Sequence, residues 1–374
     1  MTTHVFIVDD KSFKAHLKYM FVGTGSKDKD IDFNAQKHSA LHPKTENVLT
    51  AMMADFSRVR KDDFVIFYVQ ASQGSEGKFY GIYQIDSEPF YEPGGAYLKA
   101  EIGKSLTFRA RIKPFKVFAE GVTEWEALDE IKRIHSPNQM LWSLIYRKLK
   151  GNRGNTMITL YEAYRLFHLI EAKNNYISLN GTSFSYDNTK QVSAMQPIPN
   201  YTGNTNDIFN IKPRLIHKKH TNKAYEAHLQ MYITQQLGRN DSLDNALKIN
   251  RNGLEWIGNE VSCGVGMQRI DIMFSQNIDT ITKEIVPIEL KAVPASKENI
   301  RQISRYIDWI EQYYIPNIPS IIRPVLICPK SNLSKDTIDA FNTFNSNSQG
   351  RYLPLEYIEV TDNGTDLIFT NTPY

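Results

Sequence analysis

The stretch Ile285-Val-Pro-Ile-Glu-Leu-Lys291 has the apolar composition of a short buried strand, yet it contains an acid. A second run, Arg269-Ile-Asp-Ile-Met-Phe274, contains Asp271 in the same way. Because side chains alternate along a strand, Glu289 and Lys291 lie on the same face. An acid within an apolar run needs a partner, and we expect Asp271 and Glu289 to share one.

A divalent cation is the simplest partner for two carboxylates that converge in a partly buried site, because it offsets their mutual repulsion. Hard oxygen ligands favour Mg²⁺ or Mn²⁺. A lysine beside the metal would orient a water molecule and stabilise charge on a phosphate. The pattern therefore predicts metal-dependent hydrolysis of phosphodiesters.

The segments on either side have helical patterns. Apolar and aromatic residues recur with helical spacing over 296–313, which places Gln302 and Tyr306 on one face. Over 224–237 the spacing predicts an amphipathic helix, with Glu226 at the edge of its apolar face. Together with the strands, these helices predict a mixed sheet flanked by helices, with the acids at its mouth.

In this order the motifs resemble the PD-(D/E)XK nuclease superfamily, in its RecB-like and NucS-like branch with a Gln-x-x-x-Tyr motif. The matching pieces, within roughly residues 215–330, are Gly264-Val-Gly-Met-Gln-Arg-Ile-Asp271, Glu289-x-Lys291, Gln302-Ile-Ser-Arg-Tyr306 and the upstream Glu226. The resemblance implies a restriction-endonuclease-like fold in which Glu226, Asp271 and Glu289 bind metal. It implies that Lys291 acts on the nucleophilic water. It also implies that Gln302 and Tyr306 support the site or contact the DNA backbone.

Asp271 and Glu289 are also compatible with an ordinary α/β domain that exposes them and pairs them with neighbours. An inactive relative would retain the same order of motifs. Glu226 is one of several acids in this part of the chain, with Glu255 and Glu260 nearby, and acids on helices are usually solvated.

The first half of the chain has strand patterns. The apolar segments 62–69 and 78–85 flank a glycine-containing loop and predict a β-hairpin, and 106–113 alternates apolar and basic residues like a half-buried strand. Several such strands in a small domain predict a curved sheet or barrel with helices. The fold class is therefore α+β and α/β.

The order of these strands, followed by Ser87-Glu-Pro-Phe-Tyr91, resembles the PUA-like group that includes the EVE and YTH domains. The resemblance implies an aromatic-lined pocket that holds one nucleobase, with Trp125 and Trp142 as candidate stacking residues. Further candidates are Tyr68 and Tyr83 as stacking faces, and Asp86, Ser87 and Asn138 as polar readers of the base edge. Aromatic residues at this density are also typical of a hydrophobic core.

Length and composition agree with a soluble protein of two domains. The chain has 374 residues, 41% hydrophobic and 23% charged. We expect a PUA-like recognition domain over 1–172, a linker or surface segment over 173–214 and a nuclease domain over 215–374. No apolar run is long enough for a membrane span, and the start does not have the pattern of a signal peptide. The two cysteines make no disulfide or metal framework. These features predict a cytoplasmic protein.

The net charge of +3 is too small to argue for nucleic-acid binding by itself. Local clusters supply candidate phosphate contacts: Lys218 and Lys219 before the predicted nuclease helix, Arg153 in a basic glycine-containing loop, and Arg269 beside the strand acid. A solvated surface would account for each cluster equally well.

We therefore predict a Mg²⁺- or Mn²⁺-dependent endonuclease of restriction type that cuts double-stranded DNA and whose first domain reads a sequence or a modified base. Double-strand cutting needs two active sites, which predicts a homodimer. A mismatch- or structure-specific repair endonuclease, similar to NucS, would use the same residues. A non-catalytic nucleic-acid-binding protein would have the same periodicities.

Overall fold

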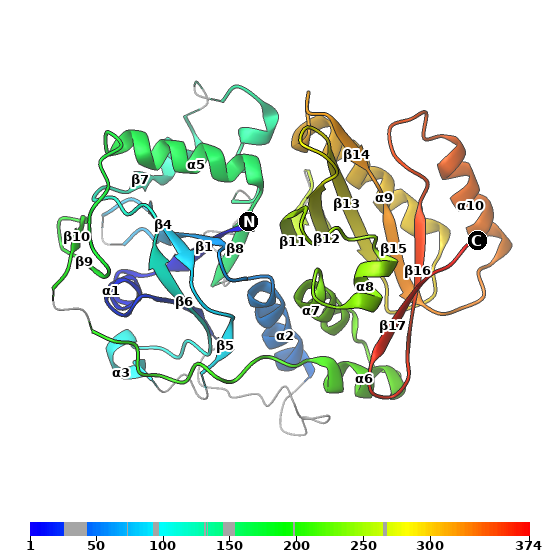
Figure 1. The fold of residues 1–374 in the computed structure, drawn as a ribbon, viewed down its shortest axis with the longest axis horizontal. Helices are drawn as coiled ribbons and strands as arrows, with labels where there is room; N and C mark the ends of the chain where they lie inside the picture. The colour runs from blue at the N-terminus through cyan, green and yellow to red at the C-terminus, as the bar shows by residue number, and fades with distance from the viewer. Residues whose placement is uncertain are drawn as a thin grey trace. The chain divides into compact units, whose positions relative to one another are not determined.

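The computed structural model describes residues 1–374 except 26–42, 73, 93–96, 131, 133, 145–153, 197–198 and 265–267. The described residues divide into two compact units, the first within 1–31 and 55–209 and the second within 32–54 and 210–374 (Figure 1). Among these residues, no helix combines the length and apolar character that crossing a membrane requires.

The first unit is built mainly from short strands and a few helices. Its elements are β1 (Thr3–Val8), α1 (Asp10–Tyr19), β2 (Phe21–Thr24), β3 (Phe64–Val69), β4 (Lys78–Ile85), β5 (Phe90–Tyr91), α3 (Lys99–Ile102), β6 (Phe108–Pro114), β7 (Val122–Thr123), α4 (Glu124–Leu128), β8 (Asn155–Ile158), α5 (Leu160–Lys173), β9 (Phe184–Tyr186) and β10 (Val192–Ala194). Helix α2 (Pro43–Ser57) contributes residues to both units.

These strands form a curved mixed sheet in the order β2-β6-β4-β3-β1-β8 (Figure 1). Strands β1 and β3 are parallel, and β3 and β4 form the predicted antiparallel pair. Five of the six β3 side chains are buried, so aromatic residues of this strand belong to the core. The helices begin at side-chain caps: Thr159, for example, accepts from the backbone of Glu162, whose carboxylate accepts from Thr159 N–H.

The segment predicted as a linker or surface segment, 173–214, packs onto the first unit as far as residue 209. Its β9 and β10 form a small antiparallel pair, and Phe184 is fully buried. The Tyr186 ring lies 4.9 Å, centroid to centroid, from that of Phe13 on α1. These aromatic contacts make the segment a structural part of that unit.

From residue 210 on, the second unit has three helices followed by strands and two further helices. Its elements are α6 (Lys212–His220), α7 (Glu226–Gln236), α8 (Asp241–Ala246), β11 (Leu254–Ser262), β12 (Arg269–Asn277), β13 (Lys283–Leu290), α9 (Lys297–Trp309), a π-helical turn (Ile310–Tyr314), β14 (Ser320–Ile322), β15 (Val325–Pro329), α10 (Lys335–Ser346), β16 (Glu356–Asp362) and β17 (Leu367–Asn371).

Its sheet has the order β11-β12-β13-β15-β16-β17. The first three strands are antiparallel, whereas β13, β15 and β16 run parallel because α9 and α10 make the crossover connections. The predicted fold class, a curved sheet with helices and a mixed sheet flanked by helices, is confirmed.

The prediction of an amphipathic helix over 224–237 is wrong. Every residue of α7 from His228 to Thr234 is buried, so the helix has no polar face in this stretch. It packs on β11, β12 and β13, and its polar Gln230 is buried with them. A helix that is covered on several sides does not show a simple stripe of apolar residues.

Candidate active site

Asp271 and Glu289 lie opposite each other on neighbouring strands. The antiparallel register of β12 and β13 ends at the pair Ile272 and Ile288, so Asp271 and Glu289 are the next residues on the two strands, and a hydrogen bond from Leu290 N–H to Asp271 Oδ2 joins them there. Residues directly opposite in such a pair point to the same face, with Cβ atoms about 5 Å apart. The two carboxylates therefore converge at one end of these strands.

Asp271 is held by the neighbouring backbone. Its Oδ2 accepts a 2.8 Å hydrogen bond from the backbone N–H of Leu290, and its own backbone carbonyl accepts one of 2.9 Å from Nε2 of Gln230 on α7. Burial and, next, the negative charge of Glu289 raise the pKa of Asp271 well above its usual range. The Leu290 hydrogen bond opposes this shift only in part. Without a bound cation, the site therefore favours a proton on Asp271.

Glu289 is almost completely buried, at 1% exposure, and has a donor on each side. The Tyr306 hydroxyl on α9 donates a 2.5 Å hydrogen bond to Oε2. The Lys291 ammonium lies 2.5 Å from Oε1, as an ion pair without good hydrogen-bond geometry. A buried carboxylate with these two partners has a fixed orientation.

Lys291 remains a cation in this setting. Burial by itself would lower the pKa of Lys291, but the Glu289 carboxylate outweighs burial, with the charges of Asp271 and Glu226 adding to it, and the pKa is raised. A lysine that keeps its proton is a donor and a positive charge rather than a base. It can orient a water molecule or stabilise a phosphate oxygen, and it does not remove a proton.

Glu226 lies at the rim of the same site. It is the first residue of α7, is exposed, and lines a cavity of about 100 Å³ together with Gln230, Glu260 and Asp271. Glu260 is the alternative to Glu226 that the sequence also contains, and both line the same cavity as Asp271. The sequence patterns do not single out Gln230, because its role depends on contact with a residue 41 positions away.

The acids provide the oxygen ligands that a hard divalent cation prefers, but water would have to complete its coordination shell. The donors are carboxylate oxygens, and the pKa of Asp271 is raised first by burial and next by the charge of Glu289. Among the described residues, no group of three or more His, Cys, Asp or Glu side chains is arranged to hold a metal ion alone. Mg²⁺ commonly binds through one or two carboxylates and retains several waters, so this donor set fits it.

Gln302 lies on α9, which carries Tyr306, and Arg269 lies on β12, which carries Asp271. Gln302 is half buried on α9, one turn before Tyr306. The Arg269 guanidinium forms an ion pair with Glu260. Arg269 is therefore partly neutralised beside the cavity, which weakens the case for it as a phosphate contact.

The basic cluster on α6 does not form an open cationic surface. Lys218 is buried, at 5% exposure, so the structure contradicts its predicted role as a phosphate contact. The Lys219 ammonium lies 2.6 Å from Oδ2 of Asp362, which neutralises its charge. The predicted contact at Arg153 lies outside the described residues.

The aromatic candidates of the first unit do not form one pocket. Tyr68 and Tyr83 are core residues with 1% and 0% exposure, so their predicted stacking role is wrong. Trp142 is half buried, whereas Trp125 on α4 is 56% exposed. Of these four, Trp125 alone presents much of its ring to solvent.

The polar readers predicted with them are also engaged within the protein. The Asp86 carboxylate lies 3.5 Å from the Lys113 ammonium, and the Ser87 hydroxyl accepts a 2.9 Å hydrogen bond from the backbone N–H of Arg111. Asn138 is buried. These contacts give Asp86 and Ser87 structural roles in the first unit.

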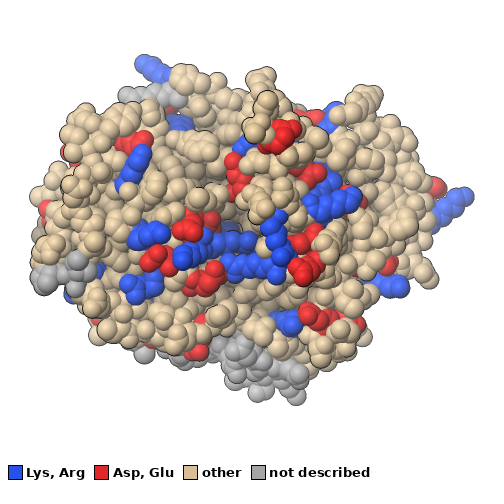
Figure 2. Space-filling view, in the orientation of Figure 1, with Lys and Arg blue, Asp and Glu red and all other residues tan. Residues whose placement is uncertain are grey.

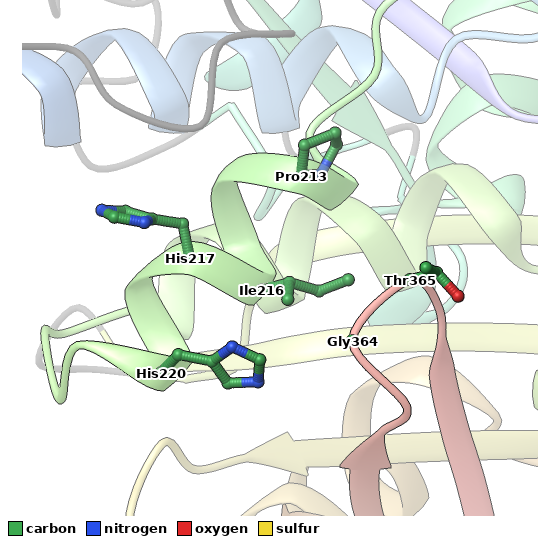
Figure 3. Close-up of a pocket in the computed structure, with 6 residues that line it drawn as sticks. All are labelled: Pro213, Ile216, His217, His220, Gly364 and Thr365. Atoms are coloured by element: carbon green, nitrogen blue, oxygen red, sulfur yellow. The ribbon is translucent and has the colours of Figure 1, made fainter.

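A second cavity, of about 330 Å³, lies between α6 and the turn that joins β16 to β17. Figure 3 shows His217 pointing away from Gly364 and Thr365, so the two imidazoles of this cavity do not converge. Nε2 of His220 lies 2.8 Å from Oδ1 of Asp362. The cavity shares no lining residue with the one at Asp271.

No protein-family model matches this chain, and no curated protein matches it. Among solved structures, a hypothetical protein from Leishmania major has 13% sequence identity and a TM-score of 0.31, over 46% of this chain and 96% of that one. Human THYN1, solved in complex with 5-methylcytosine-containing DNA, has 11% identity and a TM-score of 0.27, over 46% of this chain and 98% of that one. Likenesses this distant leave the family and function to be argued from the residues themselves.

Proposed function

We propose that the second unit is a metal-dependent nuclease that hydrolyses phosphodiester bonds of DNA. The observation that carries the proposal is the register that sets Asp271 against Glu289, with the Lys291 ammonium on Glu289. Two acids and a protonated lysine at the ends of adjacent strands can bind a hard cation and a phosphate together.

Each side chain has a distinct role in this proposal. Asp271 and Glu289, with the rim acid Glu226 and water, would hold Mg²⁺ or Mn²⁺, and the ion would supply Lewis-acid stabilisation of the phosphate and its leaving oxygen. Lys291 donates to the attacking water or to a phosphate oxygen. Tyr306 is a positioning residue, because its hydroxyl fixes Glu289.

The first unit is proposed to select the substrate. Its exposed Trp125 offers a stacking face to an unpaired or flipped base, and a reader fused to a nuclease suits a restriction-type enzyme. Double-strand cutting would then require a homodimer.

The test is cleavage of unmodified, cytosine-modified and adenine-modified plasmid DNA by the full chain, with Mg²⁺ or with EDTA. Wild type is compared with Asp271→Asn, Lys291→Met and, as a matched control far along the strand, Lys283→Met. Metal-dependent cutting that the first two substitutions abolish and the control retains supports the proposal. Cutting that survives Asp271→Asn and Lys291→Met contradicts it.

The preferred substrate separates the biological roles. Dependence on one short sequence or one modified base supports restriction, whereas a preference for mismatched or branched DNA supports repair. Binding without cleavage of any substrate supports the non-catalytic alternative.

A further inference from the structure

Three basic residues recur at every fourth position of α9: Lys297, Arg301 and Arg305. All three are exposed. An α-helix advances 1.5 Å and turns about 100° per residue, so each step of four moves the side chain about 6 Å along the axis and about 40° around it. The three cations therefore form a diagonal row on α9, which we call the α9 basic row.

The row leads to the acids. Arg305 precedes Tyr306, whose hydroxyl holds Glu289. Arg301 and Lys297 lie one and two turns farther toward the start of the helix. Arg305 is therefore the residue of the row nearest to Tyr306 along α9.

Most other cations of this unit are already neutralised. The ion pairs of Lys219 with Asp362, Arg269 with Glu260 and Arg351 with Glu311 are examples. Figure 2 shows the same tendency on one face of the molecule, where red carboxylates lie beside many of the blue cations.

The α9 basic row departs from this pattern. Arg301 and Arg305 form no ion pair with the described carboxylates, and Lys297 is 3.8 Å from Asp336 in a solvent-exposed pair. The pKa of the nearby acid Glu298 is lowered, first by hydrogen bonding near Ser296 and less strongly by the charges of Lys297 and Arg301. Lys297 and Arg301 also line a groove of about 490 Å³ between α9 and α10. The row therefore keeps its positive charge at the surface.

We propose that the α9 basic row binds the phosphodiester backbone of the DNA strand that enters the active site. This inference rests on the proposed function and identifies the surface that would orient its substrate. Guanidinium groups bind phosphate with two parallel hydrogen bonds, and such contacts set the register of the strand without reading its sequence. Arg305 then positions the strand next to the acids, and Lys297 holds it farthest from them.

The test is DNA binding measured by fluorescence anisotropy over a range of salt concentrations. The full-length Asp271→Asn protein binds a short fluorescein-labelled duplex, or the corresponding single strand, so that the probe stays intact. Arg301→Gln and Arg305→Gln are compared in this background. The matched control is Lys248→Gln, an exposed lysine whose carbonyl accepts from Gln276, about 17 Å along β12 from Asp271.

Each arginine substitution is expected to reduce the slope of log affinity against log salt by about one. It is also expected to weaken the binding of DNA duplexes of unrelated sequence equally. The control is expected to keep the wild-type slope. An unchanged slope in both arginine variants, an equal loss in the control, or no measurable binding of either probe overturns the inference.

The failure of this inference is distinguishable from failure of the nuclease. Metal-dependent cutting by wild type combined with unchanged slopes overturns the α9 basic row alone. Reduced slopes in a protein that cuts no substrate support the row as a DNA contact and contradict the nuclease.

Discussion

The hydroxyl of Tyr306 donates a 2.5 Å hydrogen bond to Oε2 of Glu289 and joins α9 to β13 at the candidate active site. The Glu289 carboxylate is 1% exposed, and the Lys291 ammonium lies on its other oxygen. A buried carboxylate depends on every such partner, because water cannot replace one that is lost. The contact therefore links the stability of the second unit to the chemistry proposed for the site.

Tyr306→Phe removes the donor and leaves Oε2 buried without it. The free energy of unfolding is expected to fall by about 1–3 kcal/mol, and cleavage to fall by about tenfold to a hundredfold because Glu289 is no longer oriented. Chemical denaturation and cleavage assays measure the two effects. Tyr232→Phe is the matched control, since its hydroxyl bonds Asp366 away from the acids. Full cleavage by Tyr306→Phe would show that the contact is structural only.

Asp271→Asn is expected to abolish cleavage and to stabilise the metal-free protein. The pKa of Asp271 is raised on folding, first by burial and next by Glu289, so the folded state holds the proton more tightly than the unfolded state. That contribution is complete below the unfolded pKa of the carboxyl and is lost as pH rises towards the folded pKa. Thermal unfolding measured at several pH values should show that the stability of the variant relative to wild type increases with pH. A stability difference between the variant and wild type that does not change with pH contradicts the raised pKa.

Mg²⁺ is expected to raise the melting temperature of wild type and to have no such effect on Asp271→Asn. At a concentration about a hundred times its dissociation constant, a ligand that binds only the folded state adds about 2.7 kcal/mol. Binding should also release protons from the site and strengthen with pH. Calorimetric titration in buffers of different ionisation enthalpy measures the protons. Equal Mg²⁺ stabilisation of both proteins would place the cation elsewhere.

Lys291→Met leaves the buried Glu289 without its cation. The expected cost is about 3–5 kcal/mol of unfolding free energy, and cleavage should fall by about a hundredfold or more. The double variant Glu289→Gln/Lys291→Met removes both charges, so it should recover stability and remain inactive. Recovery of cleavage in the double variant would exclude a chemical role for the pair.

Tyr83 in the first unit has a buried hydroxyl without a hydrogen-bond partner among the described residues. Tyr83→Phe removes that unpaired group and is expected to stabilise the protein by about 1 kcal/mol. Tyr68→Phe is the matched comparison, because its hydroxyl donates a 2.7 Å hydrogen bond to Glu124 and its removal should destabilise by a similar amount. Equal effects of both substitutions on the denaturation midpoint would contradict this assignment.

The local elements of the fold were largely predictable. The expected strand over 78–85 is β4 itself, and the expected helix over 296–313 corresponds to α9 and the π-helical turn after it. These segments each bury one face or run through a core, so their period is visible in the residues. The burial of α7 on several sides was not predictable, because neighbouring strands and helices cover a continuous run of its residues.

The basic and aromatic candidates show where local patterns are insufficient. Lys218 is buried and Lys219 is neutralised by a residue 143 positions away, although both belong to a basic segment. Tyr83 and Trp125 are both aromatic residues among apolar neighbours, yet the first is in the core and the second is at the surface. Composition does not distinguish these outcomes, because each depends on which distant residues pack against the side chain.

The sequence by itself determined the order of strands and helices and the presence of Asp271, Glu289 and Lys291 at strand positions. These are consequences of side-chain alternation and helical spacing, which act between residues close in the chain. Only the tertiary structure decided that Asp271 faces Glu289, that Tyr306 holds Glu289 and that Gln230 holds the Asp271 backbone. Each of these contacts joins residues 17 to 41 positions apart. Their partners are set by strand register and helix packing, which the local periodicity of the sequence does not encode.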